Sequence, residues 1–196
     1  MLSIDTRRAA VMRAALDAGA GVINDVTALG DDADAFGAAA EARAHVILMH
    51  MQGRPRTMQR RPSYGHAPYE VWRYLSDRVA ACADAGIPIE RIAVDPGIGF
   101  GKTDAHNLQL LSSAALLHGT GAAVMVGASR KSFIGRIFGD VPSTARLPGS
   151  LAAAMVAVSQ GVQLLRVHDV TETRQALAVV EGCLADAPMR DGRQGF

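Results

Sequence analysis

Six short apolar runs in this sequence each end in polar residues, and segments with helical periodicity separate them. Such strand–helix alternation predicts βα units with parallel strands. The expected strands cover residues 2–5, 21–25, 45–50, 92–95, 124–131 and 164–168. The carboxyl ends of parallel strands meet at one face of a barrel or open sheet, where these folds carry their sites. We therefore expect an α/β fold whose functional residues follow the strands.

The segments between the strands predict helices, because glycines follow most of them at the position of a helix C-cap. The expected helices cover residues 9–18, 34–43, 69–85, 104–117, 150–159 and 172–184. In the third of these, Val71, Leu75, Val79 and Cys82 recur at the spacing of a buried helix face.

Two connections that follow strands, residues 51–68 and 132–148, are long and are expected to be functional loops. One domain is expected over residues 1–186, followed by a disordered tail at 187–196. A closed barrel of eight βα units needs about 250 residues. This chain has 196 residues and six expected units, which are too few for such a closed barrel.

Composition excludes several classes of protein. The formal net charge of +1 does not indicate a nucleic-acid partner or an anionic membrane surface. Apolar residues make up 49% of the chain, which suits a globular domain, and no apolar run is long enough to span a bilayer. The two cysteines lie in helical segments without a close partner, which favours free thiols in the cytoplasm.

The fourth expected strand ends in Asp95, and the glycine-rich segment 96–102 follows it. A phosphate-binding P-loop is excluded because its first glycine would fall on Pro96. Glycines at this place instead allow the backbone to turn sharply or to pass close to a ligand. Asp95 is therefore either a ligand-binding carboxylate or the cap of a Pro-Gly turn and the next helix, and the spacing leaves both interpretations open.

Polar residues also follow the fifth and sixth strands. Arg130 and Lys131 are adjacent cations that would suit an anion or an aromatic ring, although a solvated strand end is the more common arrangement. Arg166 and His168 alternate with apolar residues and would point to one side of a strand, as a pyrophosphate clamp requires. The alternative is an arginine paired with Asp169 and a packed histidine.

Short polar groups follow the first three strands. Asp5 and Asn24 could hydrogen-bond the edge of a heterocycle or merely cap loops, and Asp25 could cap as well. His50 could be a metal ligand, but no second histidine or carboxylate stands at ligand spacing. We therefore favour a packed role for His50.

Six motifs occur in order along the chain: Ser3–Thr6, Ile23–Val26, Met49–Gly53, Asp95–Lys102, Ser129–Phe133 and Arg166–Val170. Together they resemble the dihydropteroate synthases of the bacterial folate pathway, and the resemblance covers nearly the whole chain. Any one motif is weak, but six in register are highly specific. The resemblance implies an incomplete TIM barrel, with six βα units of a (β/α)8 barrel. The first and last expected strands, residues 2–5 and 164–168, would then be edges.

The resemblance also implies a transferase activity. The family joins p-aminobenzoate to 6-hydroxymethyl-7,8-dihydropterin pyrophosphate and releases pyrophosphate. Its members are cytoplasmic, usually dimeric, and targets of sulfonamides. The partners expected for this chain are therefore these two small molecules and a second copy of itself.

The family's pterin-binding residues map onto four positions of this sequence. Asp95 would accept two hydrogen bonds from the pterin amino group and ring N–H. Asn24 and Asp5 would complete the recognition of the pterin edge. Phe100 would stack near the ring.

The remaining roles concern p-aminobenzoate and pyrophosphate. Lys131 would lie over the pterin and meet p-aminobenzoate, and Ser132 would hold its carboxylate. Arg166 and His168 would bind pyrophosphate, so Lys131, Arg166 and His168 are the expected catalytic residues. No protein nucleophile is required, because stabilisation of the leaving group carries the reaction.

The family's first two βα units have no counterpart in these 196 residues. In the family they supply an asparagine that binds Mg²⁺ with the pyrophosphate, and two loops, one of which carries a second arginine. Mg²⁺ is therefore implied as a cofactor, while no residue of this chain is expected to bind a metal. We also expect the 196-residue chain to turn over slowly or not at all by itself.

Two other functions remain open. One is a non-catalytic pterin-binding remnant. The other is a relative of the methyltetrahydrofolate-dependent methyltransferases, which share the fold and the acidic pterin pocket. Arg166 and His168 argue against a methyltransferase, because a methyl donor needs no pyrophosphate clamp.

Overall fold

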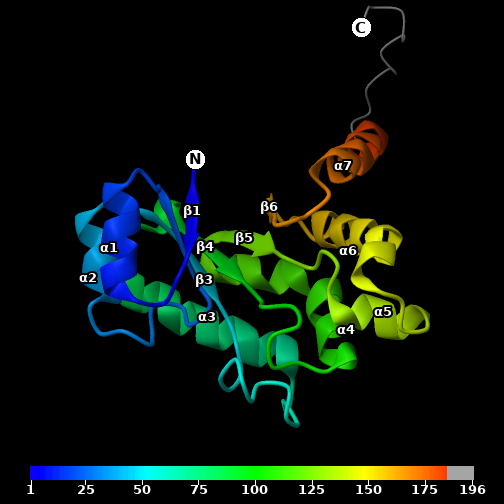
Figure 1. Cartoon of the computed structure of the whole chain (residues 1–196), viewed down its shortest axis with the longest axis horizontal. Helices are drawn as coiled ribbons and strands as arrows, with labels where there is room; N and C mark the ends of the chain where they lie inside the picture. Colours follow the sequence, from blue (N-terminus) through cyan, green and yellow to red (C-terminus); the bar gives the residue numbers. More distant parts are fainter. Residues whose placement is uncertain (185–196) are drawn as a thin grey trace, which may run out of the picture.

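A single sheet of parallel strands organises this computed structural model, which describes residues 1–184 (Figure 1). The expected tail at 187–196 lies outside the described residues, as does the expected domain end at residue 186. The strands are β1 (Ser3–Asp5), β2 (Val22–Asp25), β3 (His45–Met49), β4 (Ile92–Asp95), β5 (Ala123–Val126) and β6 (Leu164–Leu165). The α-helices are α1 (Ala9–Asp17), α2 (Ala35–Glu41), α3 (Ala67–Asp84), α4 (Asp104–Ser112), α5 (Ser132–Phe138), α6 (Leu147–Ser159) and α7 (Val170–Leu184). Short 3₁₀ helices cover η1 (Ile89–Arg91), η2 (Ala114–Thr120) and η3 (Ser143–Ala145).

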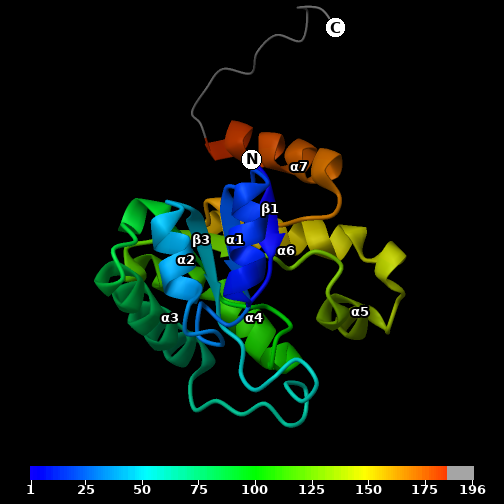
Figure 2. The same cartoon turned by 60° about the vertical axis from the view of Figure 1, so that its left-hand side comes forward.

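The sheet confirms the predicted βα succession. Within the described residues its order is β1-β2-β3-β4-β5-β6, and every neighbouring pair is parallel. The strands curl into a half-barrel with helices around it (Figure 1). β1 and β6 are its two edges, as expected. Leu2, which precedes β1, is 70% exposed, and Leu164 of β6 is 44% exposed. α7 contacts α6, and the two views together show it on the outside of the half-barrel (Figures 1 and 2).

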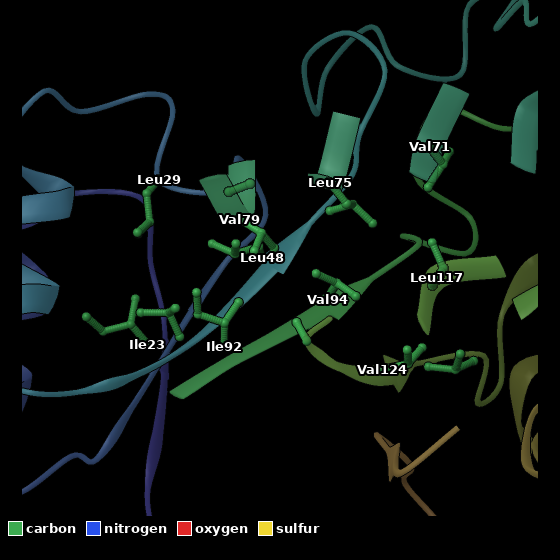
Figure 3. Packing of buried hydrophobic residues seen from close by; sticks show 14 of the residues in the cluster. Ile23, Leu29, Leu48, Val71, Leu75, Val79, Ile92, Val94, Leu117 and Val124 are labelled. Carbon is green, nitrogen blue, oxygen red and sulfur yellow. The ribbon is translucent and has the colours of Figure 1, made fainter. Parts of the chain in front are cut away.

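The hydrophobic core lies between the sheet and the helices that cover it. Ile23, Leu48, Val94 and Val124 from four successive strands are fully buried there (Figure 3). The predicted face of α3 is confirmed, because its four core positions are all buried against this layer. Burying an aliphatic side chain contributes roughly 1.5–3 kcal/mol, so these strands and α3 form a stable frame for the strand ends.

The segment 132–148 is not a loop, and that prediction is wrong. It contains α5, η3 and the first residues of α6. The glycines and prolines of this segment are typical of a loop, but Gly135 lies inside α5. A Cβ there would come 2.7 Å from Arg146 Nε and 2.8 Å from the Val141 carbonyl oxygen, so the packing explains the glycine. This glycine serves a close approach and does not interrupt the helix.

Several predicted elements are shorter than expected. The helix expected over residues 104–117 divides into α4 and η2, because Ser113, with φ of −119° and ψ of 20°, leaves the α-helical conformation. β5 ends at Val126 and β6 at Leu165, so the polar residues expected within these strands lie in the turns after them.

Candidate pterin site

Asp95 lies at the carboxyl end of β4 and is 6% exposed. Its Oδ1 accepts a hydrogen bond from the Gly97 N–H at 2.7 Å, so one oxygen holds the turn. Asp95 does not cap the next helix, because Thr103 caps α4 through a reciprocal capping box with His106. Burial raises the pKa of Asp95, while the Gly97 N–H, Lys131, Lys102 and Arg166 act in the opposite direction.

The glycine loop, residues 96–101, follows Asp95 and packs against the end of β3. Gly97, Gly99 and Gly101 all have positive φ, at 68°, 82° and 61°. A Cβ on Gly97 would lie 2.0 Å from the His50 carbonyl oxygen, and one on Gly101 would lie 2.4 Å from that of Gln52. These glycines therefore serve sharp turns and a close approach between backbone segments.

Phe100 and Lys131 stack at the opening of this loop. The Lys131 ammonium lies 4.1 Å from the centroid of the Phe100 ring, within the range of a cation–π interaction. Burial lowers the pKa of Lys131, Asp95 acts in the opposite direction, and Arg166 adds to the lowering. Ser132 follows as the first residue of α5 and is exposed. Lys131 thus lies over Phe100, and it is near enough to Asp95 for each charge to shift the pKa of the other.

Asp5, Asn24 and Arg166 meet at the edges of the half-barrel. The Asn24 amide donates to Asp5 Oδ1 at 2.6 Å, and Arg166 Nη2 donates to Asp5 Oδ2 at 2.6 Å. Arg166 therefore bridges the ends of β1 and β6, the two edge strands. Its ion pair is largely exposed, at 60% for Arg166 and 53% for Asp5, so its contribution to stability is small.

Gly127 connects this edge cluster with Asp95. A Cβ at Gly127 would lie 3.6 Å from Arg166 Cβ and 3.9 Å from Asp95 Oδ2. Arg166 and Asp95 therefore flank the same glycine, and the second carboxylate oxygen of Asp95 faces this space. Four of the expected pterin and pyrophosphate residues thus border one region at the carboxyl ends of the strands.

The expectation that Arg166 and His168 alternate along one strand is wrong. β6 ends at Leu165, and His168 contacts Ser129. The Ser129 hydroxyl lies 2.9 Å from His168 Nδ1 and accepts from the backbone N–H of His168 at 3.2 Å. Asp169 does not pair with Arg166 either. It pairs with Arg130, which turns away from Lys131, so the two adjacent cations serve different sites.

Asp25 and His50 have structural roles, as a capping residue and a packed residue. Asp25 caps the turn after β2, since its Oδ1 accepts from the Thr27 N–H at 2.7 Å and its Oδ2 from the Leu29 N–H at 3.1 Å. His50 is buried and packs against Tyr64 and Tyr74, with ring centroids 6.0 and 5.0 Å away. The packed role of His50 is therefore confirmed.

Lys102 is the residue that the sequence interpretation missed. It closes the glycine loop, is 2% exposed, and places its ammonium 3.1 Å from His50 Nδ1. A signal was present in the sequence: lysine is rare in this chain, where 18 of the 20 basic residues are arginine. In a chain that otherwise uses arginine, a lysine directly after a glycine loop indicates a position that needs a compact ammonium group.

Similarity to known proteins identifies the family. The sequence profile described as Pterin binding enzyme matches residues 1–168. The chain belongs to this family. The dihydropteroate synthase of Escherichia coli (strain K12) is 46% identical over 184 residues, which are 94% of this chain and 64% of that protein. That of Neisseria meningitidis serogroup C is 45% identical over 182 residues, covering 92% of this chain and 64% of that protein.

Solved structures of family members have the same fold. The Yersinia pestis dihydropteroate synthase in a sulfonamide drug complex superposes with a TM-score of 0.89 at 43% identity, covering 93% of this chain and 66% of that one. The Xanthomonas albilineans enzyme in complex with 7,8-dihydropteroate has a TM-score of 0.88 at 44% identity, covering 95% and 68%. The resemblance and the incomplete-barrel prediction are thus confirmed, and the chain spans 64% of the length of these curated relatives.

The family implies Mg²⁺, and the described residues do not fit it on their own. Among residues 1–184 no three histidine, cysteine or acidic side chains lie close enough together to hold a metal ion. Asp5 already pairs with Arg166, and Asp95 holds Gly97. Mg²⁺ prefers octahedral oxygen coordination, often supplied largely by substrate phosphate and water. We assign no metal ligand and no metal-dependent step to this chain.

None of the helices in residues 1–184 is both long and apolar enough to cross a membrane.

His50 should make this fold sensitive to acid. Burial, followed by the charge of Lys102, lowers the pKa of His50 from 6.5 to about 3. Between these pH values the unfolded chain binds a proton that the folded chain does not. The free energy of unfolding should therefore fall as the pH falls, by at most about 1.4 kcal/mol per pH unit from this group.

Urea denaturation between pH 7 and 4 tests this expectation. His50→Asn should flatten the dependence of the unfolding free energy on pH relative to the wild-type chain. His45→Asn, which changes an exposed histidine of β3, is the matched control and should keep the wild-type slope. Identical slopes for all three proteins would contradict the assignment of this acid sensitivity to His50.

Proposed function

We propose that this chain forms the pterin-binding part of a dihydropteroate synthase of folate biosynthesis. The reaction joins the amine of p-aminobenzoate to the exocyclic methylene of 6-hydroxymethyl-7,8-dihydropterin pyrophosphate. A C–N bond forms, the C–O bond to pyrophosphate breaks, and pyrophosphate leaves with the electron pair while the amine loses a proton. The observation that carries the proposal is the buried Asp95 carboxylate beside the Lys131–Phe100 stack.

The chemistry of a pterin suits this cluster. Its amino group and adjacent ring N–H form a planar pair of donors, which a carboxylate matches with two parallel hydrogen bonds. Asp95 Oδ2 faces the space beside Gly127. Asp95 Oδ1 already accepts from the Gly97 N–H and would accept a second hydrogen bond from the pterin. Asn24 and Asp5 lie at neighbouring strand ends and would contact the opposite edge of the ring.

The reacting groups would lie over this pterin. The partly buried Lys131 would face the ring and p-aminobenzoate, and the exposed Ser132 would hold the aminobenzoate carboxylate. Arg166 and His168 are both exposed at the end of β6 and would receive the leaving pyrophosphate. Stabilising the charge that develops on this leaving group is the main catalytic contribution expected from them.

The solved relatives support this choice of ligands. Xanthomonas albilineans dihydropteroate synthase has been solved with 4-aminobenzoic acid at 44% identity to this chain, and the Yersinia pestis enzyme with a sulfonamide drug complex. For this chain, p-aminobenzoate would be a substrate and sulfonamides a class of inhibitors. A homodimer, a cytoplasmic location and Mg²⁺ bound through pyrophosphate belong to the same proposal.

Arg166 should distinguish the pyrophosphate ester from the bare pterin. We expect Arg166→Ala to weaken the ester by about tenfold, the scale of one charged hydrogen bond, and the pterin alcohol by less than twofold. Calorimetric titration of both ligands measures this. Arg13→Ala, which breaks an exposed ion pair between α1 and α2, is the control. An equal loss for both ligands would rule out the clamp, and no binding of either ligand to the wild-type chain would rule out the proposed function.

A further inference from the structure

The chain has two lysines, Lys102 and Lys131, and the charge of each lowers the pKa of Asp95. All 18 other basic residues are arginines. Lys131 borders the opening of the site, whereas Lys102 is 2% exposed beneath the glycine loop. Lys102 therefore cannot touch a ligand. A buried ammonium is costly unless each N–H finds an acceptor and an opposite charge lies nearby, so its position calls for an explanation.

The ammonium of Lys102 joins two backbone segments. Its Nζ donates to the Phe100 carbonyl oxygen at 2.9 Å and to the His50 carbonyl oxygen at 3.2 Å, and it lies 3.1 Å from His50 Nδ1. These three acceptors use all three of its donors. A planar guanidinium with five donors would leave some of them unpaired in this closed space, which explains why arginine does not serve here.

Other side chains also hold the glycine loop, but through uncharged groups. Asn107 accepts from the Gly99 N–H at 2.7 Å, Gln59 donates to the Gly99 carbonyl oxygen at 2.6 Å, and Tyr64 donates to that of Gly101 at 2.8 Å. Lys102 differs from these attachments because it brings a charge close to Asp95. It also donates to the carbonyl oxygen of Phe100, the residue whose ring lies under the Lys131 ammonium.

We propose that Lys102 is a positioning residue of the pterin site, whose buried ammonium fastens the glycine loop to the end of β3 and supplies a positive charge beside Asp95. The inference rests on the proposed function, because it takes Asp95 as the pterin acceptor. It would keep Asp95 ionised and hold Phe100 in place beneath Lys131. The ligand that depends on it is a pterin or another ring with adjacent N–H donors.

The charges around Lys102 define what a titration should report. Burial lowers its pKa to about 7, Asp95 on β4 acts in the opposite direction, and Lys131 adds to the lowering. His50 contacts the ammonium and its low pKa keeps the ring neutral over the working range. Arg166 also lowers the pKa of Asp95. Removing Lys102 should therefore raise the pKa of Asp95, and removing the Asp95 charge should lower that of Lys102.

Lysine labelled with ¹³C at Cε gives a test that needs no ligand and no activity. The chain has two lysines, so two signals are expected, and Lys131→Met assigns them. In Asp95→Asn the titration midpoint of Lys102 should fall by about one pH unit or more, the scale for loss of a nearby opposite charge. An unchanged midpoint would overturn the coupling, whether or not the chain binds pterin.

Pterin binding between pH 4 and 8 supplies the second test. Lys102→Met should weaken a pterin analogue about tenfold near neutral pH and move the acid-side loss of binding to a pH about one unit higher. Tyr64→Phe removes an uncharged attachment of the same loop and should leave that pH unchanged. If Lys102→Met and Tyr64→Phe give the same profile, Lys102 has only a structural role. If Lys102→Met does not fold, the titration midpoint of Lys102 in Asp95→Asn decides whether the two charges are coupled.

These experiments separate the inference from the proposed function. Failure of the wild-type chain to bind pterin, together with a normal shift of the Lys102 signal in Asp95→Asn, would overturn the function and keep the charge coupling. Normal pterin binding with an unaltered Lys102 signal would keep the function and overturn the inference.

Discussion

Replacing Gly97 by alanine is expected to lower the free energy of unfolding by about 3 kcal/mol or more, because two penalties combine. Its φ of +68° is unfavourable for a residue with a Cβ. The added methyl group would also lie 2.0 Å from the His50 carbonyl oxygen. That oxygen accepts from Lys102 and belongs to the end of β3, so it cannot move away without breaking a buried hydrogen bond.

Chemical denaturation with a matched glycine separates the two penalties. Gly86 has a φ of +82°, but a Cβ there would meet nothing within 4 Å. Gly86→Ala should therefore lose only the conformational part, about 1 kcal/mol. Equal losses for Gly97→Ala and Gly86→Ala would show that the glycine loop does not approach β3 as closely as the structure indicates. The pterin site should also be lost in Gly97→Ala, because Asp95 Oδ1 is held by the Gly97 N–H.

Replacing Asp95 by asparagine should weaken binding of a pterin analogue by about 1.5–3 kcal/mol, or roughly 10- to 150-fold. Asparagine keeps the size of the side chain and can still accept from Gly97. It loses the charge, and it offers the pterin an amide donor where a second acceptor is needed. Calorimetry gives the affinity, and equal affinities in the wild type and the variant would mean that the pterin site lies elsewhere.

The same substitution also changes the charges that are buried at the site. Asparagine removes the cost of burying an ionised carboxylate, but it leaves the buried Lys102 ammonium without its opposite charge, so the two effects on stability oppose each other. Asp104→Asn is the control for binding, since Asp104 forms an ion pair with Arg136 at the start of α4. It should leave pterin affinity unchanged. A loss of affinity in Asp104→Asn would indicate a general effect on the fold and not a specific contact of Asp95.

Local pattern was enough to predict most of the framework. The apolar runs predicted all six strands, and the spacing of Val71, Leu75, Val79 and Cys82 predicted the buried face of α3. The residues at the strand ends were found for the same reason, because parallel strands bring their carboxyl ends together whatever the details of packing. The packed role of His50 also followed from local spacing, since no second ligand stood nearby.

Tertiary contacts decided the rest. The sequence around Gly135 predicts a loop, and only the close approach of Arg146 shows why the helix α5 has a glycine there. Arg166 meets Asp5 across 161 positions of sequence, and Arg130 is drawn away from Lys131 by Asp169. Lys102 is buried because His50 and Phe100 supply acceptors from two separate segments. Periodicity and glycine positions report on a few neighbouring residues, whereas the partner of a charge depends on which segments the curled sheet brings together. The sequence by itself therefore determined the strands and the face that carries the site, and only the tertiary structure decided which charges meet there.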